Sequence, residues 1–472
     1  MNRLRRLTVL IISLIALGLI VPIGLAQSGS TSWSAPENFS QQPDGYSEAP
    51  TILCDPYQNA HAFWVERLDN NTASVLYYRS NVGGAWSPPL DVVMTGPVLS
   101  ISAVLTPDDV AHVIGQTSYR GDLFHTQAAL IEANDAKAWL DPVILAARVG
   151  TSNVFVDETG ELYVLFDQPD DNNMVHTFYL LHSPDKGATW DEPMTLFTLN
   201  TPVPAAIPAR IRVDGRGRFH FVYQIRSLQY GVYSLVGYRR SLDRGATWSP
   251  PLILASGNTS PGVDQIGVFT FGADELHLTW DQPERRHQWS FDGGETWSQP
   301  ITIMELGAAF GGLNVLDKDS AGTLHVISAV GDGVYHATWD GQNWNPPELI
   351  DGRFIDPHNQ SLAICEGNRL HVVYNDRTGE TEVWYATRQV NAPRIGARPL
   401  PTPTPAPPPT STPAASGPAA ADATAAPTLS AISRQQPNYD ATDSALPIVL
   451  GTVLVSALLI GAAGVHFIRS RS

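Results

Sequence analysis

The amino-acid sequence predicts an all-β fold: a seven-bladed β-propeller over residues 31–390, closed by its own N-terminal strand and followed by a C-terminal transmembrane helix. Three observations predict the propeller. A Trp-x-x-Pro phrase recurs, a short apolar strand recurs in phase with it, and no amphipathic helical period interrupts them. Units of four short strands at a period of about fifty residues are typical of propeller blades.

The Trp-x-x-Pro phrase occurs seven times, at intervals of 47 to 58 residues. Its tryptophans are Trp33, Trp86, Trp139, Trp190, Trp248, Trp297 and Trp344. The second marker also occurs seven times, as runs such as "HAFW" (61–64) and "HVVY" (371–374), which are rich in β-branched and aromatic residues. A third strand, such as "VLYYRS" (75–80), follows in each unit, so each unit is predicted to contain four antiparallel strands.

The two ends of the repeat region do not match, and this mismatch predicts a split blade. No blade precedes the phrase at Trp33, and no Trp-x-x-Pro follows the last strand run at 371–374. We therefore expect residues 31–40 to supply the outer strand of a blade whose three inner strands come from residues 359–390. Such a strand closes the ring and removes its exposed edges.

Charge and the two chain ends predict where the protein is found. A net charge of -17 and a pI near 5.1 argue against nucleic acid as a partner, because phosphate binding needs clustered Lys and Arg. Residues 1–26 have the basic start, apolar core and small-residue site of a secretory signal peptide, with an uncleaved anchor as the alternative. Residues 446–468 are long and apolar enough to span a bilayer, and the basic residues 469–472 predict a cytoplasmic tail.

Residues 391–445 are rich in Pro, Thr and Ala and are predicted to form a disordered stalk between propeller and membrane. The expected localisation is therefore the cell membrane, through a single-pass anchor, with the propeller on the extracytoplasmic side. The two cysteines, Cys54 and Cys365, each end the predicted innermost strand of the first or the last blade. A disulfide between them would join the ring across its seam, if the two strands allow the required Cα separation of about 4.4 to 6.8 Å.

Three units carry a longer phrase, Ser-x-Asp-x-Gly-x-Thr-Trp, at 183–190, 241–248 and 290–297. This phrase resembles the Asp-box, or BNR, repeat of the sialidase-like propeller superfamily. The resemblance places the phrase in the turn between the third and fourth strands, where Asp accepts backbone N–H groups, Gly takes a positive φ and Trp fills the space between blades. The residues concerned are Ser183, Asp185, Gly187, Trp190, Ser241, Asp243, Gly245, Trp248, Ser290, Asp292, Gly294 and Trp297.

Six of the strand runs carry a histidine, which raises the question of a metal site. The histidines are His61, His112, His220, His277, His325 and His371. Zinc or copper needs three or four ligands at one point, whereas equivalent positions of a ring are spread around its axis. We therefore expect these histidines to hold strand register, and we expect neither a metal nor a cofactor.

Resemblance to sialidases implies a search for their catalytic residues: three Arg that hold the substrate carboxylate, a Tyr–Glu nucleophile, an Asp acid/base and an Arg-Ile-Pro phrase near the first blade. The segments "PARIR" (208–212) and "PRIG" (393–396) have the wrong order and place for that phrase. The first inner strand, "EAPTILCD" (48–55), contains no Arg. Sialidases of this superfamily also have six blades, so no catalytic residue is assigned.

By the same resemblance, ligands bind on the face opposite the Asp-box turns, at loops between the second and third strands and between blades. Charged residues recur in these segments, and a rim of carboxylates and guanidiniums suits sugars or peptide surfaces. The candidate ligand-binding residues are Glu66, Arg67, Arg120, Asp122, Asp167, Arg226, Asp281, Arg285, Asp376 and Arg377.

Three functions remain open from the sequence. The first is a membrane-anchored, surface-displayed, non-catalytic propeller that binds a glycan or a protein, which the anchor, the stalk and the missing Arg-Ile-Pro phrase favour. The second is a divergent exo-glycoside hydrolase of the sialidase type, which the Asp-box phrases and the acidic loops favour. The third is a purely architectural component of the cell envelope.

Overall fold

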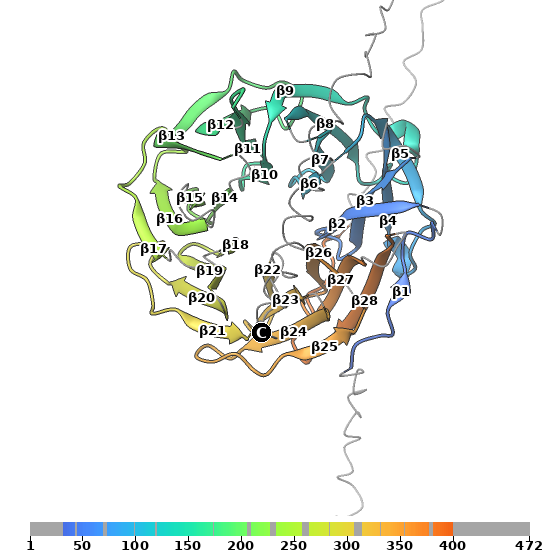
Figure 1. The fold of residues 1–472 in the computed structure, drawn as a ribbon. Helices are drawn as coiled ribbons and strands as arrows, with labels where there is room; N and C mark the ends of the chain where they lie inside the picture. Colours follow the sequence, from blue (N-terminus) through green and yellow to red (C-terminus); the bar gives the residue numbers. More distant parts are fainter. Residues whose placement is uncertain are drawn as a thin grey trace, which may run out of the picture. The chain divides into compact units, whose positions relative to one another are not determined.

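A computed structural model describes residues 32–399, apart from 43–44, 69–72, 99, 119, 173, 205–208, 227–232, 257–263, 283, 306–313, 331, 354 and 377–380. The described strands form seven four-stranded antiparallel sheets arranged around a central axis (Figure 1). The prediction of seven blades is confirmed. The predicted signal peptide, transmembrane helix and cytoplasmic tail, and most of the predicted stalk, lie outside the described residues. Within those residues no helix is long and apolar enough to cross a membrane.

The strands of each blade follow one another from the axis outward. Blade 1 contains β2 (Tyr46–Cys54), β3 (Ala60–Arg67), β4 (Ser74–Ser80) and β5 (Leu90–Thr95). Blade 2 contains β6 (Ser100–Leu105), β7 (Val110–Gln116), β8 (Gly121–Ala129) and β9 (Val143–Val149). Blade 3 contains β10 (Ser152–Val156), β11 (Leu162–Pro169), β12 (Met174–Ser183) and β13 (Met194–Pro204). Short 3-10 turns, η2 (Val82–Gly84) and η3 (Ala136–Ala138), precede β5 and β9.

The second half of the ring repeats this order. Blade 4 contains β14 (Ala209–Val213), β15 (Phe219–Arg226), β16 (Tyr233–Ser241) and β17 (Leu252–Ser256). Blade 5 contains β18 (Asp264–Phe271), β19 (Glu275–Gln282), β20 (Glu284–Ser290) and β21 (Ile301–Met304). Blade 6 contains β22 (Asn314–Lys318), β23 (Leu324–Val330), β24 (Gly333–Trp339) and β25 (Glu348–Asp351). Blade 7 contains β26 (Ile355–Cys365), β27 (Arg369–Asp376), β28 (Val383–Gln389) and β1 (Glu37–Asn38).

Blade 7 is the predicted split blade. Its outer strand β1 pairs antiparallel with β28, with Glu37 opposite Tyr385. Beyond this short strand, the Ser34 amide donates to the Thr387 carbonyl at 2.9 Å and the Phe39 amide to the Val383 carbonyl at 2.7 Å. The N-terminal segment therefore covers the edge of β28, and the predicted closure of the ring is confirmed.

The tryptophans of the Trp-x-x-Pro phrase pack between blades. Six of the seven lie against a Tyr or His ring on the third strand of the preceding blade. The centroid distances are 5.7 Å for Trp139 and Tyr78, 5.4 Å for Trp190 and His125, 5.0 Å for Trp297 and Tyr238, 5.3 Å for Trp344 and His287, 5.3 Å for Trp33 and His336, and 5.2 Å for Trp86 and Tyr385. Trp248 instead packs against Phe221 of its own blade, at 5.9 Å. The repeat of the sequence is thus a repeat of the contact between blades.

The six repeated histidines are buried on the second strands and hydrogen-bond to the third strands. His61, His220 and His371 contact tyrosines, with Nδ1 to Oη distances of 2.7, 2.8 and 2.8 Å. His112, His277 and His325 contact a second histidine at 3.1, 2.8 and 2.9 Å. Several also reach a carboxylate in the turn below, as His61 Nε2 does with Asp55 at 3.0 Å. These contacts fix the register of neighbouring strands.

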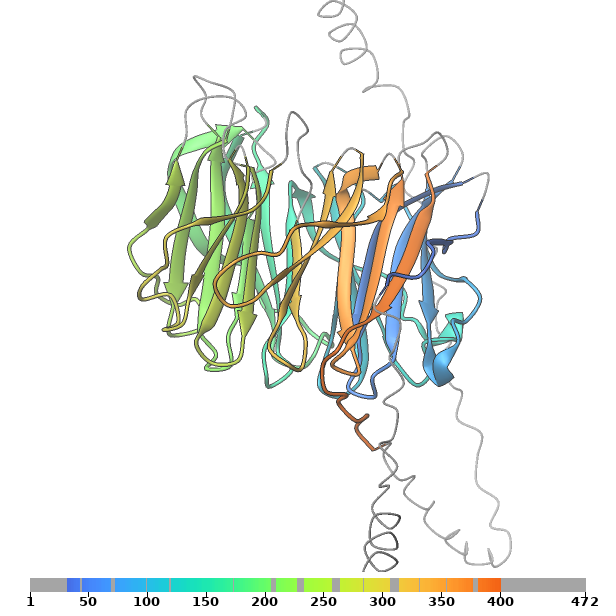
Figure 2. The same cartoon turned by 90° about the horizontal axis from the view of Figure 1, so that it is seen from below.

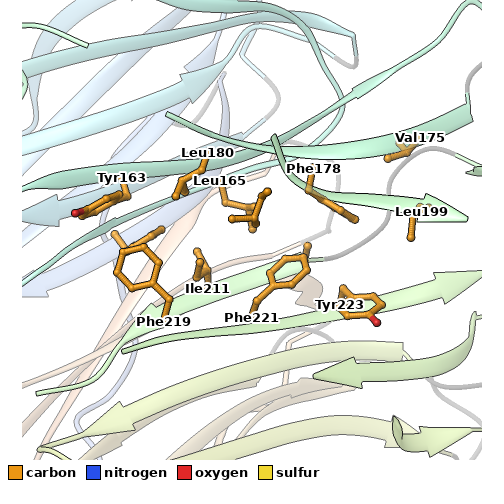
Figure 3. Packing of buried hydrophobic residues seen from close by; sticks show 13 residues of the cluster. Tyr163, Leu165, Val175, Phe178, Leu180, Leu199, Ile211, Phe219, Phe221 and Tyr223 are labelled. Carbon is orange, nitrogen blue, oxygen red and sulfur yellow. The ribbon is translucent and has the colours of Figure 1, made fainter. Parts of the chain in front are cut away.

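Hydrophobic side chains fill the space between neighbouring blades. Figure 3 shows this packing between blades 3 and 4, where the rings of Tyr163 and Phe178 face those of Phe219 and Phe221. Phe178 and Phe221 meet in a T-shaped arrangement at 5.4 Å, a geometry that aromatic rings prefer. Burial of apolar area stabilises a fold by about 25 cal/mol per Å², so the packed blade interfaces stabilise the ring.

Candidate functional site

The alternation of antiparallel strands gives the ring two different faces. Turns after the first and third strands of each blade lie on one face, which we call the turn face. Connections after the second and fourth strands lie on the other, the loop face. Figure 2 shows the ring from the side, with the strand ends at both faces and the segment 391–399 leaving at the turn face.

The three Asp-box phrases form hydrogen-bonded turns on the turn face. In the first, Thr189 donates its amide to Asp185 Oδ1 at 2.7 Å, and the Gly187 amide donates to Ser183 Oγ at 2.7 Å. Gly187 has a φ of 87°, a conformation that a side chain disfavours. The hydrogen bond from the Thr189 side chain and then the one from its amide hold the pKa of Asp185 below its usual value. The turn uses these polar groups internally, which gives them a structural role.

The other two phrases repeat this arrangement. Thr247 donates its amide to Asp243 Oδ1 at 2.8 Å, and Thr296 donates to Asp292 Oδ1 at 2.9 Å. In the same two phrases, the Gly245 amide donates to Ser241 Oγ at 2.8 Å and the Gly294 amide donates to Ser290 Oγ at 2.9 Å.

The candidate residues of blade 1 lie at the loop-face end of β3. Glu66 is buried and accepts a hydrogen bond from the Ser47 hydroxyl, while Arg67 forms an ion pair with Glu48. Burial raises the pKa of Glu66, an effect that the Ser47 hydrogen bond partly offsets. The two residues are adjacent in sequence but have separate partners on β2, so they do not form the expected charge pair.

Asp281 and Arg285 do form a pair, but within blade 5. The segment expected to be a loop is a hairpin in which β19 contains Asp281 and β20 contains Arg285, directly opposite each other. Arg285 donates Nε to Oδ1 at 2.9 Å and Nη2 to Oδ2 at 3.0 Å. Both side chains are buried, so this bidentate pair joins two strands.

Asp167 and Asp376 are likewise buried at strand ends. Asp376 accepts hydrogen bonds from the Glu382 amide at 3.0 Å and from Trp384 Nε1 at 3.1 Å. Asp167 accepts one from the Thr151 hydroxyl, and burial raises its pKa to about 7. Both carboxyl groups hold segments of the loop face together.

The remaining candidates lie in loops or outside the described part. Arg120 donates Nη2 to the Asp170 carbonyl of blade 3 at 2.6 Å and lies 3.8 Å from Asp171, so its described ion pair is not with Asp122. Asp122 is half-buried and bonds through its backbone to Thr117. Arg226 ends β15, and its side chain is not described; Arg377 lies outside the described residues. The eight candidates whose side chains are described thus have separate local partners and do not form one site.

A cavity of about 880 Å³ lies on the axis, bounded by the first strands of the blades. Its titratable lining residues, among those described, are Arg210 and Arg212 of β14 and Asp317 of β22. Burial raises the pKa of Asp317 to about 6, although the Lys318 and Ile364 amides donate to it. Among the described residues, no group of three His, Cys, Asp or Glu side chains is arranged to hold a metal ion.

Sequence reasoning missed these three residues, two of which lie in the segment "PARIR". Two Arg at alternate positions of a short strand must point to the same side, which is the available signal. What the strand pattern does not give is the direction of that side relative to the ring axis.

Comparisons with known proteins agree with the fold. Neither a protein-family model nor a curated protein matches this chain. A solved structure similar to it is the BP39L lectin of Burkholderia pseudomallei, with a TM-score of 0.54 and 14% identity over 72% of this chain and 95% of that one. The polysaccharide lyase Uly1 is similar with a TM-score of 0.49 and 10% identity, over 73% of this chain and 90% of the lyase chain. The NanB sialidase of Streptococcus pneumoniae is similar with a TM-score of 0.43 and 10% identity, over 76% of this chain and 70% of the sialidase chain.

The fold and the axial cavity define the chain as a seven-bladed β-propeller with a central channel lined by both apolar and polar side chains. The propeller fold expected from the Asp-box phrases is confirmed. At these identities the likeness concerns the fold alone.

Proposed function

We propose that this protein is a membrane-anchored, surface-displayed propeller that binds a glycan at the loop-face end of its channel and does not cleave it. The axial cavity of about 880 Å³ has the size of a small-molecule site and can hold a mono- or disaccharide. The similar fold of a lectin supports a binding role. The buried bonding of Glu66, Asp281 and Asp376 supports a structural use of these carboxyl groups.

Display at a membrane is supported by the apolar run 446–468 and the basic residues after it, and the structure describes how the chain leaves the last blade. The Arg398 amide donates to the Pro56 carbonyl at 2.9 Å, and its guanidinium donates to Tyr57 Oη at 2.8 Å and pairs with Asp109. The Ile395 amide donates to the Glu366 carbonyl at 2.8 Å. All these partners lie in turns between first and second strands, so the chain leaves the ring from the turn face.

The experiment is a glycan array probed with the full-length protein, together with a screen of fluorogenic sialosides and other glycosides. We expect retention of a defined set of glycans and no release of the fluorophore. Hydrolysis of any glycoside would support the sialidase-type alternative. Absence of glycan retention, with capture of a specific surface protein, would replace the glycan with a protein ligand.

Orientation is tested separately on intact cells that express the full chain. An impermeant amine reagent should label the exposed Lys137 of η3 without cell lysis. Labelling only after lysis would contradict surface display.

A further inference from the structure

Among the described residues, two arginines of blade 4 stand in the channel without a carboxylate partner. Arg210 and Arg212 occupy alternate positions of β14, so their side chains leave the strand on the same side. Both line the axial cavity and are half-buried. Within the described part of the chain, neither guanidinium has a carboxylate within ion-pair distance, and no acidic side chain contributes to the pKa of either one.

The described hydrogen bonds of this pair use only part of its donor capacity. Arg212 Nη1 donates to Asn153 Oδ1 at 3.0 Å and to the Ile211 carbonyl at 2.9 Å. Arg210 Nη1 donates to the Ala209 carbonyl at 2.9 Å. A guanidinium carries five N–H donors, so most donors of both groups are left for a ligand in the cavity.

The electrostatics of this position favour an anion. Burial lowers the pKa of Arg210, and burial together with repulsion from Arg210 lowers the pKa of Arg212 to about 10. Both groups remain positively charged at neutral pH, and two like charges removed from bulk water repel each other strongly. An anion between or beside them offsets this cost and accepts their forked donors.

Register places Arg210 among groups that suit a sugar. Arg210 pairs with the residue two positions after the repeated histidine of its blade, as do Thr51, Ser102 and Ser361 in theirs. All four line the cavity. Ser361 Oγ accepts from the Ile52 amide at 3.1 Å and Ser102 Oγ from the Val154 amide at 3.4 Å, so both hydroxyl hydrogens can donate to a ligand. One strand position can thus supply both an anion partner and hydroxyl partners.

The next position toward the turn face is mostly apolar. Arg212 and Asp317 pair with the repeated histidines of blades 4 and 6, and Leu53, Val104 and Phe269 pair with those of blades 1, 2 and 5. The cavity therefore changes from polar near the loop face to apolar deeper in, where the charged residues of this second position are Arg212 and Asp317.

We propose that Arg210 and Arg212 bind the acidic group, a carboxylate or a sulfate, of a sugar that enters the channel, an assignment that rests on the glycan-binding function proposed above. The acidic group lies against blade 4, and the hydroxyls of the same sugar meet the serine and threonine hydroxyls of the neighbouring blades.

The test uses the full-length protein, its Arg210→Gln and Arg212→Gln variants, and Arg216→Gln as the matched control. Arg216 lies in the turn after β14, is exposed and pairs with Asp274, which keeps Arg218 as a second partner. Probes are matched neutral, uronic-acid, sialylated and sulfated oligosaccharides on an array, and free glucuronate and sulfate in a thermal-shift assay. The uronate and sulfate arms distinguish the two forms of the acidic group.

We expect wild type and the control to retain acidic oligosaccharides, and each channel variant to bind them at least about ten-fold more weakly. Retention of neutral glycans alone, or equal binding by all variants, would overturn the assignment and leave glycan binding intact. Arginine-dependent thermal stabilisation by free anions without glycan retention would support the anion site and contradict glycan binding. Absence of both signals would overturn both proposals. If a Gln variant fails to fold, Arg212→Lys keeps the charge without the fork and should bind with intermediate affinity.

Discussion

Cys54 and Cys365 form a disulfide that joins the first strands of blades 1 and 7, with a Cα–Cα distance of 5.5 Å and a sequence separation of 311 residues. The same two blades meet where the N-terminal segment covers β28, so covalent and strand closure lie at one seam. A ring of stacked blades depends on closure because an open seam would expose strand edges and blade faces to water.

Replacing both cysteines by serine should lower the free energy of unfolding by about 3 to 5 kcal/mol, because a long closed loop loses its constraint in the unfolded chain. Urea unfolding of the oxidised wild type and of the Cys54→Ser/Cys365→Ser variant measures this difference. Reductant should shift the wild-type midpoint and leave that of the variant unchanged. Equal midpoints for the two proteins would mean that the other seam contacts suffice.

Phe39 is the core residue that the N-terminal segment brings to the seam. It is fully buried, with ring centroids 4.8 Å from Trp86 and 5.2 Å from Tyr385. Phe39→Ala should cost about 3 to 5 kcal/mol of stability, since it leaves a cavity among these rings. Phe291→Ala removes a mostly exposed ring of the turn face and is the control, with little change expected. Equal small effects would argue against a role of the N-terminal segment in closure.

The buried histidine pairs predict acid sensitivity. Burial, followed by the neighbouring His125, lowers the pKa of His112 to about 3. Burial lowers the pKa of His125 to about 4. Burial together with nearby positive groups lowers the pKa of His336 and of His371 to about 3. These folded-state values lie below the usual 6.5, so the unfolded chain binds more protons below that pH. Stability should therefore fall as the pH drops from about 6.5 toward 4.

The carboxyl groups of Asp167 and Asp317 act in the opposite direction, because burial raises the pKa of Asp167 to about 7 and of Asp317 to about 6. They are outnumbered by the histidines, so the net slope should still be a loss of stability on acidification, with about 1.4 kcal/mol per pH unit for each histidine. Chemical denaturation at constant ionic strength between pH 7.5 and 4 measures it. His112→Leu/His125→Leu should reduce the slope, and a flat profile in the wild type would contradict the neutral buried pairs.

Asp317 should make anion binding depend on pH. The described titratable side chains that line the cavity are this carboxyl and the two guanidiniums of Arg210 and Arg212, which stay charged. Above its pKa of about 6 the carboxylate repels an anionic ligand, and below it the neutral carboxyl does not. Acidic sugars should bind more tightly at pH 5 than at pH 7.5, as measured by calorimetry. Asp317→Asn should bind tightly at both pH values, and an unchanged pH dependence in this variant would exclude the role of Asp317.

Most of the fold could be predicted from sequence because it depends on local, repeated signals. The recurring tryptophans mark the contact between blades, and the unmatched phrase at Trp33 predicted the split blade. The candidate site was harder to predict from the sequence, because a charged residue in a predicted loop does not reveal which side chain it contacts. In the structure Glu66 hydrogen-bonds to Ser47, and Asp281 hydrogen-bonds to Arg285. Composition likewise predicted a stalk from residue 391, whereas Arg394 and Arg398 hold its first residues against the turn face.

Binding without cleavage at the channel arginines is tested most sharply by the mass of the glycan recovered after incubation with the full-length protein. We expect wild type to retain an acidic glycan, the recovered glycan to have unchanged mass, and Arg210→Gln/Arg212→Gln to retain little of it. A recovered glycan shorter by one sugar would contradict a non-catalytic role, and equal retention by wild type and the double variant would contradict binding at the two arginines.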